Sequence, residues 1–161
     1  MLVAISAAHG REELTQLWAD HTSALGFDAV MVATTAGQKE PSGANFISIA
    51  IENDPLAGKF NAAMEHALAI GADRIMILPS DDFASQEWVD AARASTDDYI
   101  IPQSCGVYSP ATEQAYLIHK FSAGTLRFGA GRVVSRKAVR KCGELWTPTI
   151  SGGLDTSSHS R

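Results

Sequence analysis

The segment "GKFNAAMEHALAIGADRIMILPSDD" (residues 58–82) contains a helix pattern that leads directly into a strand pattern. Gly71 ends the helical part, whose apolar stripe consists of Phe60, Ala63, Met64, Ala67 and Leu68. A short apolar run then reaches Pro79 and two adjacent aspartates, Asp81 and Asp82. A helix that feeds a buried strand is the repeating unit of a parallel α/β sheet, so this stretch indicates the fold class.

The same alternation continues on both sides of this segment. Apolar runs predict strands at 2–8, 27–37, 44–54 and 73–80, and helical spacing predicts helices at 14–25, 58–71 and 85–95. Ser85 is the expected cap of the last of these helices. Strands and helices that alternate at this pitch predict a mostly parallel sheet with helices on both faces.

The second half of the chain changes character. Shorter strands of mixed direction are predicted within 97–104, 113–124 and 125–135. A helix is expected at 135–143, with Ser135 as its cap. The tail at 147–161 is polar and rich in Gly and Ser, which predicts a loop.

Bulk properties fit one globular domain of 161 residues with 45% hydrophobic content. No apolar run approaches the roughly 18 residues of a membrane span, and the first residues lack the features of a signal peptide. Cys105 and Cys142 match no metal-ligand spacing, so we expect reduced thiols in a cytoplasmic protein. The net charge of −5 argues mildly against a wide polyanion surface; the basic stretch 131–141 is better read as a solvated helix face.

The adjacent aspartates follow the fourth predicted strand, so they should lie at the carboxyl edge of the sheet, where open α/β sheets bind ligands. Carboxylate oxygens at such an edge suit Mg2+ or Mn2+ shared with substrate phosphates. An alternative is a turn that leads into the next helix, with Asp82 or Ser85 as its cap. Two adjacent aspartates by themselves fit both interpretations equally well.

The stretch "PSDD" (79–82) resembles the DxD segment of GT-A fold glycosyltransferases, especially those of the family 2 type. The resemblance implies a GT-A-like fold and makes Asp81 the metal-binding aspartate. Asp82 would assist it, and Ser80 and Asp81 would contact the nucleotide sugar. Pro79 departs from the family pattern, which has Gly or Asp there, and leaves fewer carboxylates for the metal.

Two further segments resemble the same family in the expected order. Upstream, Pro55, Gly58, Lys59 and Asn61 look like the loop that opens the helix before the DxD strand, which implies that Lys59 and Asn61 hold the nucleotide diphosphate. Taken in isolation, this segment is better explained as a plain turn at Gly58 with a solvated Lys59.

Downstream, "FGAGRVVSRKAV" (128–139) resembles the acceptor side of the site, with Gly129, Ala130 and Gly131 allowing close approach of a sugar. Without the other matches, a structural bulge is the better explanation of these glycines. Trp146 is a candidate for stacking on a sugar ring, although a Trp beside Leu145 is more often a core residue.

The tail resembles the region in which inverting members of the family place their general base. "GLD" makes Asp155 the candidate that takes a proton from the acceptor hydroxyl. His159 is a candidate metal ligand, although a terminal histidine without a ligand role is the more common case. Inversion is implied by the resemblance alone.

The ends of the first two strands are expected to form the nucleoside site, lined by Ser6, Ala7, His9 and Arg11. Arg11 is a candidate contact for phosphate or base. Thr34 and Thr35 stand where many relatives carry acidic residues. A UDP-sugar is favoured by family habit.

These expectations describe a GT-A-like domain over 1–161, with residues 1–83 as the nucleotide-sugar half and 84–161 as the acceptor half. The expected activity is metal-dependent, inverting glycosyl transfer with Mn2+ or Mg2+. The acceptor stays open among a saccharide, a protein, a lipid-linked sugar and a modified base of phage DNA. A homo-oligomer stays open as well.

Two other functions remain. A nucleotidyltransferase would share the sheet and the carboxylate edge, but "AAHGRE" (7–12) offers one Gly and one Arg where a Gly-rich basic loop is usual. A non-catalytic module that binds a nucleotide or a sugar is the third reading, because the chain has only six residues after Asp155.

Overall fold

A central sheet of six strands organises the chain in the computed structural model, which describes residues 1–43, 46–52, 55–119 and 129–147. The strand order is β3-β2-β1-β4-β8-β5. The strands are β1 (Leu2–Ala7), β2 (Ala29–Thr35), β3 (Phe46–Ile51), β4 (Arg74–Ile77), β5 (Tyr99–Ile100) and β8 (Arg132–Ser135). β1 to β4 pair in parallel, whereas β8 is antiparallel to both of its neighbours. The predicted mostly parallel α/β sheet is therefore confirmed.

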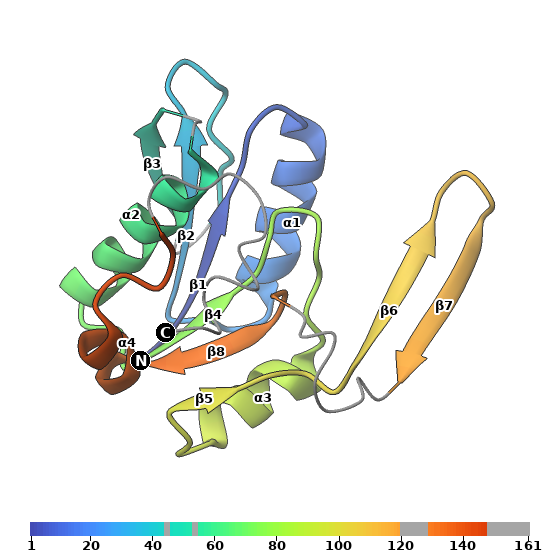
Figure 1. Cartoon of the computed structure of the whole chain (residues 1–161). Coiled ribbons are helices and arrows are strands. Elements are labelled where there is room, and N and C mark those ends of the chain that lie inside the picture. Colours follow the sequence, from blue (N-terminus) through green and yellow to red (C-terminus); the bar gives the residue numbers. More distant parts are fainter. Residues whose placement is uncertain (44–45, 53–54, 120–128, 148–161) are drawn as a thin grey trace.

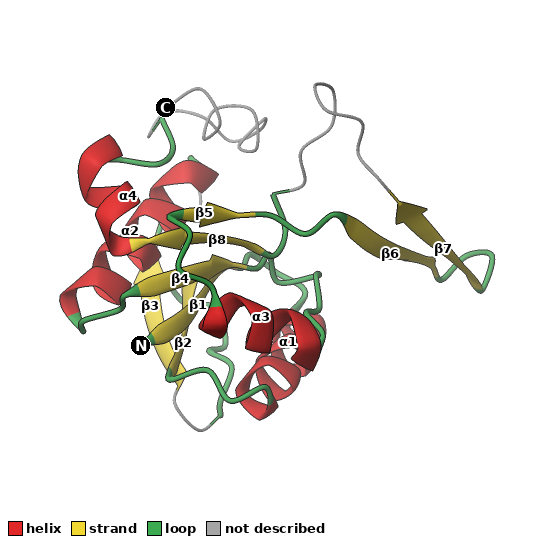
Figure 2. Ribbon diagram, turned by 90° about the horizontal axis from the view of Figure 1, so that it is seen from below, coloured by secondary structure: helices red, strands yellow, loops and turns green. Residues whose placement is uncertain are grey.

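Four helices cover both faces of this sheet (Figure 2). They are α1 (Glu12–Ala24), α2 (Leu56–Ala69), α3 (Gln86–Ala94) and α4 (Arg136–Cys142). α2 and α4 pack on one face and α1 and α3 on the other. No helix within the described ranges has both the length and the apolar character to cross a membrane.

Alternating residues of each strand feed two separate hydrophobic cores. In β1, Val3 and Ile5 join the core under α2 and α4, whereas Leu2 and Ala4 join the core that includes Trp18 of α1. All six residues of β1 are buried, as expected for a strand in the middle of a sheet covered on both sides. Burial on both faces of the sheet explains why the sequence of β1 is a nearly continuous apolar run.

The helix boundaries follow the predicted capping chemistry. Ser85 Oγ accepts a hydrogen bond from Trp88 N at 3.3 Å, and Ser135 Oγ accepts one from Ala138 N at 3.0 Å, so both predicted caps are confirmed. α2 begins at Leu56, two residues earlier than predicted, because Pro55 serves as its N-cap in an extended conformation.

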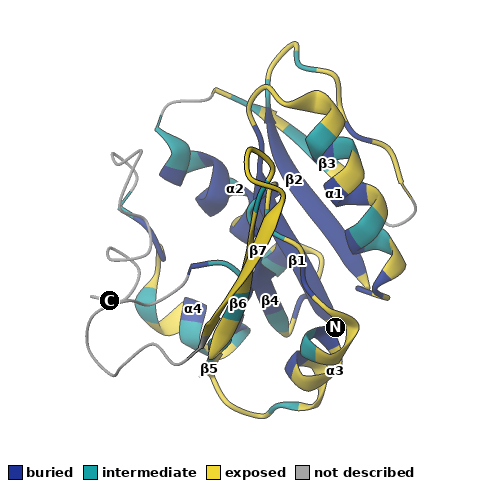
Figure 3. Cartoon of the chain, turned by 90° about the vertical axis from the view of Figure 1, so that its right-hand side faces the viewer, coloured by how far each residue is buried: buried dark blue, intermediate teal, exposed yellow. Residues whose placement is uncertain are grey.

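The strands β6 (Ser104–Ser109) and β7 (Gln114–His119) form an antiparallel hairpin that is not part of the main sheet. The hairpin projects from the body of the molecule (Figure 1). Its large apolar side chains are mostly exposed (Figure 3), among them Val107, Tyr108, Tyr116, Leu117 and Ile118. Cys105 in β6 and Cys142 in α4 are free thiols, as predicted.

Candidate functional site

The order of the strands reverses between β1 and β4. From β1 the chain moves outward to β2 and β3, and then crosses back to place β4 on the other side of β1. In open α/β sheets ligands bind outside the carboxyl ends of the strands at such a point. The segments that leave β1 and β4 here are 8–11 and 78–82, so they frame the candidate site.

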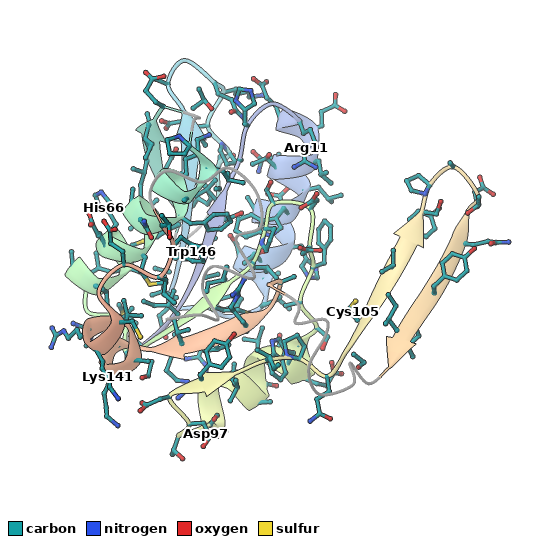
Figure 4. The ribbon with its side chains drawn as sticks, viewed as in Figure 1. Arg11, His66, Asp97, Cys105, Lys141 and Trp146 are labelled. Atoms are coloured by element: carbon teal, nitrogen blue, oxygen red, sulfur yellow. The ribbon has the colours of Figure 1, made fainter. Side chains whose placement is uncertain are left out.

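Arg11 and Asp81 meet across this point. Nη1 of Arg11 donates to Oδ2 of Asp81 at 2.8 Å, and the two side chains are 55% and 48% exposed. Arg11 has left-handed backbone angles, φ 51° and ψ 45°, and it occupies the N-cap position of α1. Figure 4 shows Arg11 at the start of α1, at the end of the molecule where the β1 loop turns into the helix. The structure thus joins two residues that the sequence assigned to one site through separate motifs.

The preceding residue prepares this loop for its conformation. Gly10 also has a positive φ, 60°, and its carbonyl accepts a hydrogen bond from Gln38 Nε2 at 3.1 Å. A left-handed conformation is uncommon for a residue with a side chain and is often found at functional sites. Gln38 was not among the predicted residues, because nothing in its local sequence indicates this contact.

Lys59 lies beneath the same loop, fully buried. Its Nζ donates to the carbonyl of Ala8 at 2.6 Å and to Oγ1 of Thr35 at 2.8 Å. Burial lowers the pKa of Lys59, because removal from water penalises the charged form. Lys59 therefore joins α2 to the ends of β1 and β2 and orients the loop, whereas the sequence predicted a surface cation for the diphosphate.

His9, Thr34 and Thr35 lie at the ends of β1 and β2. Nδ1 of His9 lies 2.8 Å from Oγ1 of Thr35, and His9 is exposed. Thr34 Oγ1 pairs with Ser48 Oγ at 3.3 Å. The hydroxyl of Thr35 is thus the shared partner of Lys59 and His9. The sequence pattern shows Thr35 only as standing where an acidic residue is common, and it does not predict this role.

Ser6 and Ala7 are the last residues of β1, and both are buried. Ser6 is fully buried in β1, and its hydroxyl has no hydrogen-bond partner among the described residues. Ala7 is 8% exposed. The buried part of the strand extends past them because Ala8 N still bonds to the carbonyl of Ala33 at 2.9 Å. Burial argues against the predicted lining role of both side chains, and His9 is the first exposed residue after β1.

The segment after β4 forms a turn. Asp82 N donates to the carbonyl of Pro79 at 3.0 Å, and Ser80 between them is buried. Ser85 caps α3, so the turn reading is correct for the backbone while the carboxylate of Asp81 remains half-exposed at the edge.

The fit to a divalent cation rests on these two aspartates. Within the described ranges, no group of three or more His, Cys, Asp or Glu side chains could hold a metal ion by itself. Asp81 and Asp82 nevertheless are two adjacent carboxylate residues in the turn after β4, and Asp81 is exposed. Mg2+ sites that share their ion with substrate phosphates commonly use one or two carboxylates, so the residues fit a substrate-dependent cation and not a complete protein cage.

The segment predicted as the acceptor side has packing roles. Gly131, with φ 73°, donates its N–H to the carbonyl of Ile77 at 2.7 Å, and its own carbonyl accepts from Trp88 Nε1 at 2.7 Å. Gly129 is buried, and its carbonyl accepts from Nε of Arg132 at 2.9 Å. Ala130 is half-buried. These contacts support the structural alternative for the glycines.

Trp146 and Asn61 belong to the core between α2 and α4. Trp146 is 1% exposed, and its ring lies 5.2 Å from that of Phe60, centroid to centroid. Asn61 Nδ2 donates to the carbonyl of Trp146 at 3.0 Å. The predicted stacking of Trp146 on a sugar and the predicted nucleotide contact of Asn61 are therefore corrected, because both side chains are committed to the interior. Asp155 and His159 lie outside the described residues.

The helical part of the basic stretch 131–141 lies away from the candidate site, whereas Gly131 and Arg132 adjoin Ile77 at the carboxyl end of β4. Arg132 is buried, Arg136 Nε donates to the carbonyl of Ala72 at 2.7 Å, and Lys137 pairs with Asp98 at 2.8 Å. Ala72 lies just before β4, at the amino edge of the sheet. The interpretation as a helix face agrees with the contacts of α4, whereas residues 131–135 are buried in a turn and in β8.

Among the comparisons with known proteins, only those with solved structures found similarity, and it is distant. No protein-family model matches the sequence, and no curated protein matches it. Among solved structures, the chain is similar to the crystal structure of 2-C-methyl-D-erythritol 4-phosphate cytidylyltransferase from Thermus thermophilus, with 14% identity and a TM-score of 0.46. The match covers 98% of this chain and 84% of that one.

Proposed function

We propose that the chain binds a nucleoside-diphosphate sugar across the carboxyl ends of β1 and β4 and transfers the sugar to an acceptor hydroxyl. The observation that carries this proposal is the 2.8 Å contact between Arg11 and Asp81. A guanidinium, which can bind phosphate, and a carboxylate, which can bind a cation, meet where the strand order reverses, and open α/β folds bind ligands at such points.

Each residue near this point has a role in the proposed reaction. Asp81 and Asp82 would hold Mn2+ or Mg2+, which when bound neutralises the charge of the departing nucleoside diphosphate. Arg11 adds a guanidinium for the phosphates. His9 is exposed on the proposed nucleoside side of the site, and Lys59 holds the loop that carries His9 in place.

The proton of the acceptor hydroxyl must also be removed. Asp155 is the proposed general base, because an ordinary carboxylate can take this proton as the hydroxyl attacks the anomeric carbon. The resulting displacement would invert the configuration of the sugar. The acceptor is proposed only as a hydroxyl compound.

Nucleotidyl transfer is the second candidate, and one observation favours it. Arg11 follows Gly10 in a left-handed turn directly after β1 and faces the carboxylate edge. A basic group in this loop is what a nucleotidyltransferase needs to hold a triphosphate. The sequence offers only one Gly and one Arg here, fewer than the Gly-rich basic loop that is usual for this function.

Calorimetric titration of UDP, GDP and CDP, each with and without Mn2+, tests the site. We expect one nucleotide to bind in a Mn2+-dependent manner, and Asp81→Asn to weaken that binding about tenfold or more through loss of a charged ligand. Asp97→Asn is the matched control, since Asp97 is an exposed aspartate before β5, far from Arg11 (Figure 4). Absence of binding by all three nucleotides would remove the basis of the proposal.

A second assay separates the two reactions. Release of nucleoside diphosphate from the matching nucleotide sugar would support glycosyl transfer. Release of pyrophosphate from a nucleoside triphosphate in the presence of sugar phosphates would support nucleotidyl transfer. Tight binding with neither product would favour the third reading, a binding module without catalysis.

A further inference from the structure

The ion pair between Arg11 and Asp81 engages the carboxylate that the proposed cation site needs. Oδ2 of Asp81 lies 2.8 Å from Nη1 of Arg11, a charge-assisted contact. A guanidinium and a divalent cation repel each other at such distances, so one carboxylate does not readily serve both. Building on the proposed function, we propose that Arg11 is an exchangeable counter-ion. It holds Asp81 until the cation binds, and then turns to a phosphate oxygen of the nucleotide.

The side chain of Arg11 is suited to this exchange while its backbone is fixed. The carbonyl of Arg11 accepts from Thr15 N at 2.9 Å, in the first turn of α1. Among the described residues, Asp81 is the partner of the guanidinium, and the pair is about half exposed. Ion pairs with this exposure contribute little to the free energy of folding, so separating the two side chains requires little free energy.

Phosphate is the second partner because of the charges around the loop. The N-terminus of α1 is a weak anion site by itself, since Glu12 and Glu13 occupy its first turn. Lys59 is buried under the loop with its donors engaged by Ala8 and Thr35. The guanidinium of Arg11 is an exposed cation on this loop, and its planar fork matches phosphate oxygens.

Arg11→Gln tests the exchange with two probes, Mn2+ alone and the nucleotides UDP, GDP and CDP at saturating Mn2+. We expect Mn2+ alone to bind about two- to fivefold more tightly, because its competitor for Asp81 is gone. We expect the nucleotide to bind about tenfold more weakly, because a charged phosphate contact is lost. A misfolded variant would bind both probes more weakly, so the opposite signs identify the exchange.

Arg93→Gln is the matched control. Arg93 pairs with Asp28 at 3.1 Å, and the two side chains are 43% and 40% exposed, much like Arg11 and Asp81. This second pair lies at the opposite edge of the sheet, where Asp28 accepts from the N–H of Leu2 at the start of β1. Its loss should change neither affinity.

The two probes also separate the inference from the proposed function. If Arg11→Gln binds Mn2+ no more tightly than wild type, or binds the nucleotide equally well, the exchange is overturned. If wild type binds none of the three nucleotides, the proposed function fails. In that case tighter Mn2+ binding by Arg11→Gln still supports the counter-ion role, and unchanged or weaker Mn2+ binding overturns it.

Discussion

Lys59 and Thr35 meet in the interior, with Nζ of the lysine 2.8 Å from Oγ1 of the threonine. The same Nζ lies 2.6 Å from the carbonyl of Ala8, so one side chain of α2 fixes the ends of two strands. No carboxylate in the described part of the chain forms an ion pair with it. A charged ammonium that is buried with only neutral partners destabilises the fold. We infer that the role of Lys59 is to orient the loop that carries His9 and Arg11.

The stability of the protein should respond to pH through Lys59. Its folded pKa lies below the usual 10.5, so between these two values the unfolded chain binds more protons and stability rises with pH. Relative to Lys59→Met, wild type should therefore gain free energy of unfolding as the pH is raised towards 10.5. Urea denaturation of both proteins across the alkaline range measures this.

The control for this comparison is Lys141→Met. Lys141 lies in α4 at an exposed position, so its replacement should change the free energy of unfolding by less than about 0.5 kcal/mol. A wild type that loses stability relative to Lys59→Met as the pH rises would contradict the expectation.

Asp28 should show a dependence of the same sign, but at acid pH: stability falls as the pH is lowered. The hydrogen bond from Leu2 N, at 2.7 Å, and then the pairing with Arg93 lower the pKa of Asp28 below its usual 3.8. Its contribution is present above this value and is lost as the pH falls through the folded pKa. Asp28→Asn should cost about 1 kcal/mol at neutral pH, a modest value because the side chain is partly exposed.

Urea denaturation of wild type and Asp28→Asn at neutral pH and at progressively lower pH checks this prediction. The difference between them should shrink once the pH passes below 3.8. A difference that stays constant into acid would mean that the charge of Asp28 does not contribute.

Gly131 and Gly58 should respond in opposite ways to alanine. Gly131 has φ 73°, and an added Cβ would lie 3.3 Å from Nε1 of Trp88. Gly131→Ala should cost about 1–2 kcal/mol or more. Gly58 lies in α2 with nothing within 4 Å of an added Cβ, so Gly58→Ala should gain about 0.5–1 kcal/mol. Thermal and urea denaturation of the two variants test the pair, and a stabilised Gly131→Ala would be incompatible with the packing around Trp88.

The β6–β7 hairpin should contribute little to the stability of the body. Leu117 is 61% exposed there, whereas Leu78, next to β4, is 2% exposed. Leu117→Ala should change the free energy of unfolding by less than about 0.5 kcal/mol, and Leu78→Ala should cost about 2–5 kcal/mol. Denaturation at two protein concentrations measures both. A loss for Leu117→Ala that depends on concentration would instead show that the hairpin is buried between copies of the chain.

The sequence alone determined the features that depend on near neighbours. Helical spacing located α2, apolar runs located β1, β2 and β4, and local serine chemistry identified the caps Ser85 and Ser135. The aspartates after β4 were expected at the carboxyl edge because the alternation of strands and helices implies a parallel sheet. Each of these follows from periodicity or from hydrogen bonds that span only a few residues.

Contacts between distant segments were decided only by the tertiary structure. Arg11 and Asp81 are 70 residues apart in the chain and meet because β1 and β4 are neighbours in the sheet. The same strand order and helix packing bring Lys59 under Ala8 and bury Trp146 in the core. Both positions differ from the roles that the sequence motifs suggested. The packing of the helix layers on the sheet decides which side chains are buried and which stay exposed at the edge. A local sequence pattern does not contain that information.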